Sequence, residues 1–185
     1  MAQGSQVYHV EIQLADADRG RYADLQFSTP QHPSETVERL ILRLLAYALL
    51  HEEGMDFRKG GVSQGEEPDL SVHDLTGRLQ HWIEIGTPAE ERLLKAGRHT
   101  PRVTVFTHDG LLRRWKSRHG GKLPAFDGRL LCLEADLVEN LGLALPRRIQ
   151  WQMTISGGIL YLDTGDNHYS SSIIHCRRDD FPEIR

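Results

Sequence analysis

The chain is poor in the residues that mark several specialised classes of protein. It has two cysteines, Cys132 and Cys176, in 185 residues, and aromatic residues make up only 7% of it. Two isolated cysteines exclude a disulfide framework and a cysteine-based zinc motif. The longest apolar run, residues 44–50, falls far short of the roughly 20 residues that a membrane-spanning helix requires. The N-terminus lacks the charged-then-apolar order of a signal peptide, so we expect a cytoplasmic protein.

The sequence also lacks an excess of positive charge. Its 22 lysines and arginines are outnumbered by 26 aspartates and glutamates, which gives a formal net charge of -4. The whole molecule therefore has no general attraction to a polyanion, and any contact with nucleic acid must be local. The hydrophobic content of 39% and charged content of 26% are ordinary, so we predict that residues 1–185 form one domain with one core.

Several catalytic and cofactor-binding motifs are missing as well. The sequence contains no Gly-x-Ser-x-Gly elbow, no phosphate-binding loop that ends in Gly-Lys-Ser/Thr, and no dinucleotide-binding fingerprint. The ten histidines show no His-x-x-x-His or Cys/His spacing typical of a metal site. The common nucleophile, nucleotide and zinc chemistries are therefore not indicated.

Hydrophobic periodicity predicts an α/β fold. Residues 7–14 alternate as a strand does, and residues 37–48 place apolar side chains at helical spacing after the start signals Pro33 and Ser34. Further strands are predicted at 25–27, 70–73, 78–85, 103–106, 130–133, 149–155, 159–162 and 170–175, and further helices after 87, at 111–118 and at 134–143. We predict one mixed β-sheet flanked by helices, with an additional C-terminal β-hairpin that turns at Gly157-Gly158.

Two carboxylates on a predicted hairpin, Asp69 and Glu84, are the strongest candidates for chemistry. If His73 pairs with Arg78, Asp69 faces Trp82, and Glu84 lies two residues along on the same face. Carboxylates whose β-carbons are roughly 5 to 8 Å apart can share Mg²⁺ or Mn²⁺, which would activate water and clamp a phosphate. The alternatives are an acid that begins a strand and an ordinary strand acid, although an unpaired carboxylate among apolar neighbours is costly.

A lysine on the next helix is a candidate to assist these acids. Thr87, Pro88 and Glu90 form a capping-box pattern that predicts a helix start, and Lys95 lies two turns into that helix. Its side chain would reach back over the strand end and offset negative charge in the transition state. The alternative is that Lys95 pairs with Glu91 four residues earlier on a solvated helix face.

One basic segment with an aromatic residue, at 113–119, is a candidate contact for nucleic acid. Its members are Arg113, Arg114, Trp115, Lys116 and Arg118. The basic side chains would contact phosphates while the indole of Trp115 stacks on a base. The alternative is a solvated basic helix.

Motifs along nearly the whole chain resemble the bacterial YaeQ family. They are residues 32–36, Glu38-Arg39, residues 67–69, residues 82–86 and Pro88. That family in turn is similar to a circular variation on the restriction-endonuclease-like fold. The signature of this superfamily is Pro-Asp, a spacer, and then Asp/Glu-x-Lys, so the resemblance implies a restriction-endonuclease-like core.

The resemblance also implies roles for particular residues. Pro68-Asp69 and Glu84 match the superfamily signature, whereas Gly86 stands where the signature has its lysine. Lys95 would then be a migrated substitute, so the implied catalytic set is Asp69, Glu84 and Lys95. Glu38 is on the long helix, from which such folds often supply an extra acid, and it would join Asp69 and Glu84 as a metal ligand. Its alternative role is that of an ordinary helix-face acid.

Two functional hypotheses follow from these patterns. In the first, the protein is a Mg²⁺- or Mn²⁺-dependent, nuclease-like phosphodiesterase that acts on nucleic acid. In the second, it is a non-catalytic binding or interaction protein that retains the nuclease fold, and Gly86 marks the loss of the lysine.

Overall fold

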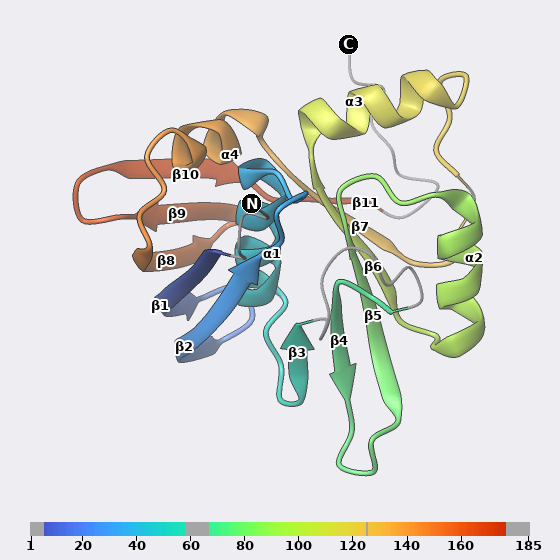
Figure 1. Cartoon of the computed structure of the whole chain (residues 1–185), viewed down its shortest axis with the longest axis horizontal. Coiled ribbons are helices and arrows are strands. Elements are labelled where there is room, and N and C mark those ends of the chain that lie inside the picture. The colour runs from blue at the N-terminus through green and yellow to red at the C-terminus, as the bar shows by residue number, and fades with distance from the viewer. Residues whose placement is uncertain (1–5, 58–66, 125, 177–185) are drawn as a thin grey trace.

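The computed structural model describes residues 6–57, 67–124 and 126–176. Within these residues the chain forms four helices and two mixed β-sheets, which confirms the predicted α/β class (Figure 1). The helices are α1 (Val37–Leu49), α2 (Glu90–His99), α3 (Asp109–Arg118) and α4 (Ala135–Gly142). The strands are β1 (Gln6–Asp16), β2 (Arg21–Gln31), β3 (Met55–Phe57), β4 (Leu70–His73), β5 (Leu79–Ile85), β6 (Val103–His108), β7 (Arg129–Leu133), β8 (Arg148–Ser156), β9 (Ile159–Asp163), β10 (His168–Ser172) and β11 (Ile174–Cys176).

The first sheet has five strands in the order β10-β9-β8-β1-β2. β1 runs parallel to β8, and the other neighbours are antiparallel. Alternate side chains of β1 are buried, as its period of two predicts. The predicted hairpin at Gly157-Gly158 is confirmed, and both glycines adopt the positive φ that such a tight turn requires. The sheet that contains this hairpin is separate from the sheet that contains β5, β6 and β7. The described residues therefore form two mixed sheets rather than the single mixed sheet that was predicted.

The second sheet has six strands in the order β11-β7-β6-β5-β4-β3, and its centre, β5-β6-β7, is parallel. Every residue of β6 is buried, because helices cover both faces of the sheet. Phe106 packs in the core that contains α1, whereas Val103 and Val105 pack with Leu93 of α2 and Leu112 of α3. The parallel part of the sheet therefore packs against α1 on one face and against α2 and α3 on the other.

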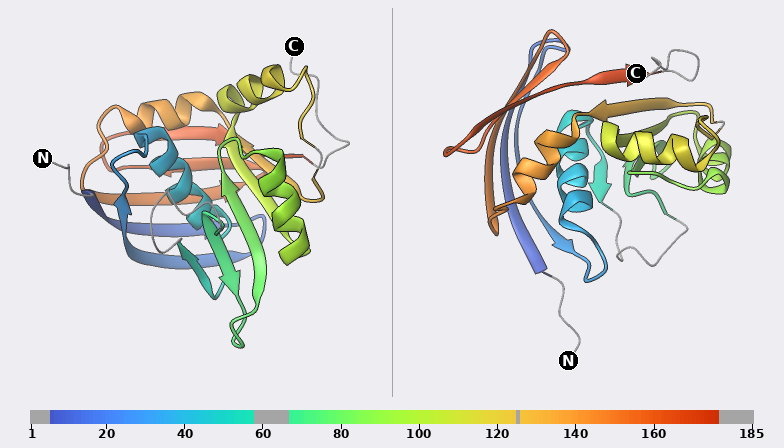
Figure 2. Two further views of the ribbon diagram at one scale, coloured as in Figure 1. Left: turned by 45° about the vertical axis from the view of Figure 1, so that its right-hand side comes forward. Right: turned by 90° about the horizontal axis from the view of Figure 1, so that it is seen from above.

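Helix α1 lies between the two sheets, and Figure 2 shows it enclosed by them. Most of its residues are buried, in keeping with its contacts on both sides. The predicted span of 37–48 agrees with the structure to within one residue, because the helix ends at Leu49. The cap is Thr36, whose hydroxyl accepts a 3.2 Å hydrogen bond from the Arg39 amide, so the predicted start signals Pro33 and Ser34 lie before the helix. None of the described helices is long and apolar enough to cross a membrane.

Other predicted boundaries also differ from the structure. Helix α2 starts at Glu90 with Ala89 as its N-cap, so the predicted cap, Thr87, was wrong. The predicted strand at 170–175 is two strands, β10 in the first sheet and β11 in the second. The glycines, serine and proline at 60–68 also predict a polar loop before β4, and this segment lies mostly outside the described residues.

Candidate functional site

The structure brings the two predicted acids together. The β4–β5 register pairs Leu70 with Ile83, and the Asp69 amide donates a 3.1 Å hydrogen bond to the Ile83 carbonyl. Extending this register by one residue sets Asp69 directly opposite Glu84, rather than opposite Trp82 as predicted. Asp69 is only 3% exposed and Glu84 only 2%. Two carboxylates therefore lie side by side in the interior.

A β-bulge determines that these acids share a face. His73 pairs with Leu79, whereas Val72 pairs with His81, so β5 has one extra residue at this point. Without that residue, the register at the turn would carry Asp69 opposite Ile83 and direct Glu84 to the other face. The extended register puts both acids on one face, and the predicted His73–Arg78 pair was wrong because His73 pairs with Leu79.

Asp69 accepts hydrogen bonds from a cationic side chain and from a backbone amide. Its Oδ1 accepts a 2.5 Å hydrogen bond from Arg39 Nη2 of α1, and its Oδ2 accepts a 2.9 Å bond from the Ile85 amide. Arg39 Nη1 also donates to Glu35 Oε1 at 3.0 Å, and Glu35 in turn is bound by Arg43. Asp69 therefore belongs to a network in which acidic and basic side chains alternate, in the order Asp69, Arg39, Glu35 and Arg43.

Glu84 is held by a different arginine. Its Oε2 lies 2.7 Å from Arg92 Nε of α2, and its Oε1 accepts a hydrogen bond from Trp82 Nε1. Arg92 also donates to the Glu67 carbonyl, and its guanidinium lies 5.8 Å from the centre of the Trp82 ring. Burial and the nearby Asp69 charge raise the pKa of Glu84 to about 7, although the bonds from Arg92 and Trp82 oppose this shift.

The other two predicted site residues lie on the flanking helices. Glu38, in the first turn of α1, is 2.8 Å from Nε2 of the buried His108 at the end of β6 and 3.6 Å from Arg114. The Leu111 amide donates to His108 Nδ1, so a neutral His108 ring donates from Nε2 to Glu38. Lys95 is half-buried on α2, one turn beyond Arg92.

The basic helix α3 borders this group of residues. Arg114 approaches Glu38, and Arg118 Nη2 donates a 3.0 Å hydrogen bond to Thr87 Oγ1, just after β5. The predicted role of Trp115 in base stacking was wrong. Its side chain is 1% exposed and packs in the core with Leu112 and Leu93, because α3 turns this residue toward the second sheet.

The acid pair does not fit Mg²⁺ or Mn²⁺ in this arrangement. Each of the four carboxylate oxygens of Asp69 and Glu84 accepts a hydrogen bond, and each residue pairs with a guanidinium. Among the described residues, no group of three or more His, Cys, Asp or Glu side chains is placed to hold a metal ion. Arg39 and Arg92 instead supply positive charge where a divalent ion would supply it.

The two arginines that contact the acids were not predicted as site residues. Arg39 lies four residues after Glu35, a spacing that predicts an ion pair along a helix, and it occurs in a motif that resembles the family. Arg92 follows Glu84 by a turn and part of a helix, and no local spacing rule connects the two positions. Only the packing of α2 beside β5 places Arg92 there.

Comparison with known proteins relates the whole arrangement to one family. Residues 1–173 match the family model described as YaeQ protein. The uncharacterised YaeQ protein of Salmonella typhi is 30% identical over 170 residues, which cover 91% of this chain and 93% of that protein. The YaeQ protein of Escherichia coli strain K12 is 28% identical over the same coverage.

Two crystal structures of YaeQ proteins have the same fold. The protein from Pseudomonas syringae superposes with a TM-score of 0.84 at 32% identity, over 95% of this chain and 98% of that one. The protein from Xanthomonas axonopodis pv. citri superposes with a TM-score of 0.80 at 29% identity, over 93% and 98%. Since the match extends over nearly the full length in both sequence and structure, the chain belongs to the YaeQ family.

Proposed function

We propose that the chain binds the phosphate backbone of nucleic acid without a metal ion and without turnover. One observation carries the proposal: guanidinium groups already neutralise both acids of the pair, Asp69 through Arg39 and Glu84 through Arg92. Guanidinium groups are the side chains best suited to bidentate contact with phosphate. An acid pair that positions arginines favours phosphate recognition over metal-assisted hydrolysis.

The surroundings of the acid pair support this proposal. Arg114 and Arg118, one turn apart on α3, extend to Glu38 and Thr87 at the edge of the pair. They add exposed positive charge beside the neutralised acid pair, where a backbone phosphate is accessible. The cytoplasmic location predicted from the sequence is part of this proposal, because nucleic acid is available there.

The binding proposal is tested by fluorescence anisotropy with labelled single-stranded and double-stranded oligonucleotides in EDTA. We expect binding that weakens as the salt concentration rises. Arg114→Ala and Arg118→Ala should each reduce by about one the slope of the logarithm of the binding constant against the logarithm of the salt concentration. Arg148→Ala is the matched control, because it removes one exposed positive charge from the first sheet, away from α3. Equal losses in all three variants, or no binding by wild type, would overturn the proposal.

The absence of a metal requirement is tested separately by calorimetric titration of Mn²⁺. We expect no micromolar binding to wild type and none to Asp69→Asn. Micromolar binding by wild type that disappears in Asp69→Asn would instead establish a metal site at the acid pair.

A metal-dependent phosphodiesterase is the second candidate, and one observation favours it. Asp69 and Glu84 repel each other strongly enough to contribute to the raised pKa of Glu84, and a divalent ion would relieve this repulsion. The resemblance to the restriction-endonuclease-like signature points the same way, with Lys95 and Glu38 as the additional residues. This activity requires Arg39 and Arg92 to leave the carboxylates. Mg²⁺- or Mn²⁺-dependent cleavage of labelled DNA or RNA that is lost in Glu84→Ala would support it.

A further inference from the structure

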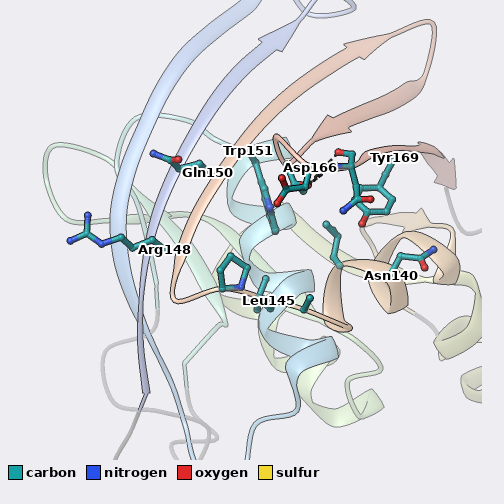
Figure 3. Close-up of a pocket in the computed structure, with 12 residues that line it drawn as sticks. Asn140, Leu145, Arg148, Gln150, Trp151, Asp166 and Tyr169 are labelled. Carbon is teal, nitrogen blue, oxygen red and sulfur yellow. Dashed lines mark hydrogen bonds between the residues drawn. The ribbon is translucent and has the colours of Figure 1, made fainter.

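A hollow of about 330 Å³ opens at the first sheet, on elements that carry none of the acid pair or its arginines (Figure 3). Its walls come from the C-terminal end of α4, the loop that follows it, β8 and the β9–β10 turn. Leu141, Leu145 and Trp151 provide an apolar surface, and Leu141 and Trp151 are almost fully buried. The volume lies at the lower end of the range for ligand pockets, roughly 300 to 1,000 Å³, which indicates a small ligand.

The hollow has one acidic lining residue, Asp166, and one basic lining residue, Arg148. Asp166 lines the hollow together with Trp151 (Figure 3), and among the described residues no ion pair includes Asp166. Arg148 and Gln150 extend away to the outer face of the sheet, where Gln150 Nε2 donates to Glu11 Oε2 at 3.1 Å. Arg148 therefore lines the hollow at its edge, and its guanidinium extends away from Trp151 (Figure 3).

The end of α4 adds to the negative potential of Asp166. Asn140 and Leu141, in its last turn, line the hollow. The final carbonyl groups of a helix carry partial negative charge, although here the Asn140 carbonyl accepts a 3.3 Å hydrogen bond from the Leu143 amide. The last turn of α4 contains no basic residue to offset that charge.

The turn that carries Asp166 is held in place by its own hydrogen bonds. The Thr164 amide donates to the Asn167 carbonyl at 3.0 Å, and the Asn167 amide donates to Thr164 Oγ1 at 3.2 Å. The Gly165 amide donates to Asp163 Oδ1 at 2.6 Å. A ligand that binds Asp166 therefore meets a turn whose conformation is already fixed, which lowers the entropic cost of binding.

We propose that this hollow binds a small organic ammonium ion. The ammonium group pairs with the Asp166 carboxylate near the carbonyl end of α4, and a short alkyl part lies against Leu141 and Leu145. This site is independent of the phosphate-binding proposal, since the two sites share no residue and prefer ligands of opposite charge.

The probe for this test is n-butylammonium chloride, titrated into the full chain and followed by amide chemical shifts and calorimetry. We expect saturable binding with shifts concentrated at residues 140–151 and 164–169. Butyrate and 1-butanol match the probe in size but not in charge, and each should bind at least tenfold more weakly. Asp166→Asn should weaken butylammonium binding at least tenfold, whereas Asp136→Asn, which removes an exposed acid from the first turn of α4, should leave it unchanged.

A second variant separates loss of the site from loss of charge. Ala144→Phe fills the hollow from its rim and leaves Asp166 in place, so it should also abolish binding. No saturable binding up to about 50 mM, equal binding of 1-butanol, or full binding by Asp166→Asn would each overturn the proposal.

Discussion

At the scale of single residues, the electrostatic arrangement of Asp69, Glu84, Arg39 and Arg92 is the most consequential feature of the protein. Two buried carboxylates face each other across adjacent strands, and each depends on a guanidinium from a different helix. Burying an ion pair costs desolvation energy, but removing one partner from an existing pair costs more, because the other charge is left uncompensated. The two arginines are therefore expected to matter more for folding than their partial exposure indicates.

Replacing Arg92 tests this dependence. In wild type, Arg92 Nε lies 2.7 Å from Glu84 Oε2. Arg92→Ala removes this ion pair and leaves Glu84 beside Asp69, so we expect it to lower the free energy of unfolding by about 3 kcal/mol. Lys95→Ala, one turn further along α2, is the matched comparison and should cost clearly less. Urea denaturation at pH 8 measures both. Equal losses in the two variants would contradict the assignment of Arg92 as the principal partner of Glu84.

The pH dependence of stability provides a second test. The pKa of Glu84 is about 7 in the folded protein and has an ordinary value of 4.5. Between these values, the unfolded chain loses the Glu84 proton as pH rises while the folded protein keeps it. This group therefore makes the folded protein less stable as pH rises from about 4.5 to about 7.

Glu84→Gln isolates this contribution, because glutamine has the same shape and does not titrate. We expect the free energy of unfolding of wild type, relative to that of Glu84→Gln, to fall between pH 5 and pH 8 in urea denaturation. A difference that stays constant over this range would show that Glu84 titrates near its ordinary value.

Sequence reasoning identified the acids but not their partners, for a physical reason. Asp69 follows a proline and Glu84 lies among apolar strand residues, so both are unusual in their local context. Arginine in a helix has no such local signature. The contacts of Arg39 and Arg92 depend on how α1 and α2 pack against the second sheet, and packing partners distant in sequence cannot be read from spacing alone.

At the scale of elements, the two helix starts make a matched comparison. Thr36 caps α1 through its hydroxyl, whereas Ala89 occupies the N-cap of α2 and makes no side-chain cap bond. Thr36→Ala is expected to lower the free energy of unfolding by about 1 kcal/mol. Thr87→Ala should cost distinctly less, because the Thr87 hydroxyl accepts from Arg118 and caps no helix. Thermal or urea denaturation of the pair decides between Thr87 and Ala89 as the cap.

The elements themselves were largely predictable, since burial on one face produces a period of two in β1 and a helical period in α1. Their assembly into two sheets was not predictable. Strand pairing between β1 and β8 is set by long-range contacts, and the division of residues 168–176 between two sheets depends on where Ile173 can pack. The predicted start signals of α1 and α2 differ from the observed caps, Thr36 and Ala89, because a cap depends on backbone geometry as well as on residue type.

At the scale of the whole molecule, α1 and one continuous core join the two sheets. Ile12 and Ile155 of the first sheet belong to the same buried cluster as Ile83 and Phe106 of the second, with α1 between them. Shared burial of this kind couples the unfolding of both sheets, because neither sheet can expose its face without exposing α1.

Single-tryptophan variants can test this coupling. Trp151 reports on the first sheet and Trp82 on the second, so each can be kept while the other tryptophans are replaced by phenylalanine. We expect Leu44→Ala in α1 to lower the free energy of unfolding by about 3 kcal/mol in both single-tryptophan variants, each compared with its own parent. A Leu44→Ala change that affects only one signal would show that the sheets unfold separately.

The parallel pairing of β1 with β8 has a consequence for how the protein is made. Val10 of β1 pairs with Ile149 of β8, so two strands about 140 residues apart in the sequence are neighbours in the sheet. At typical rates of translation, β1 leaves the ribosome on the order of ten seconds before β8. Through that interval the β1–β2 hairpin exposes a backbone edge and an apolar face that only later segments cover. Nascent chains that stop before β8 are therefore expected to aggregate or to require a chaperone, whereas completed chains are not.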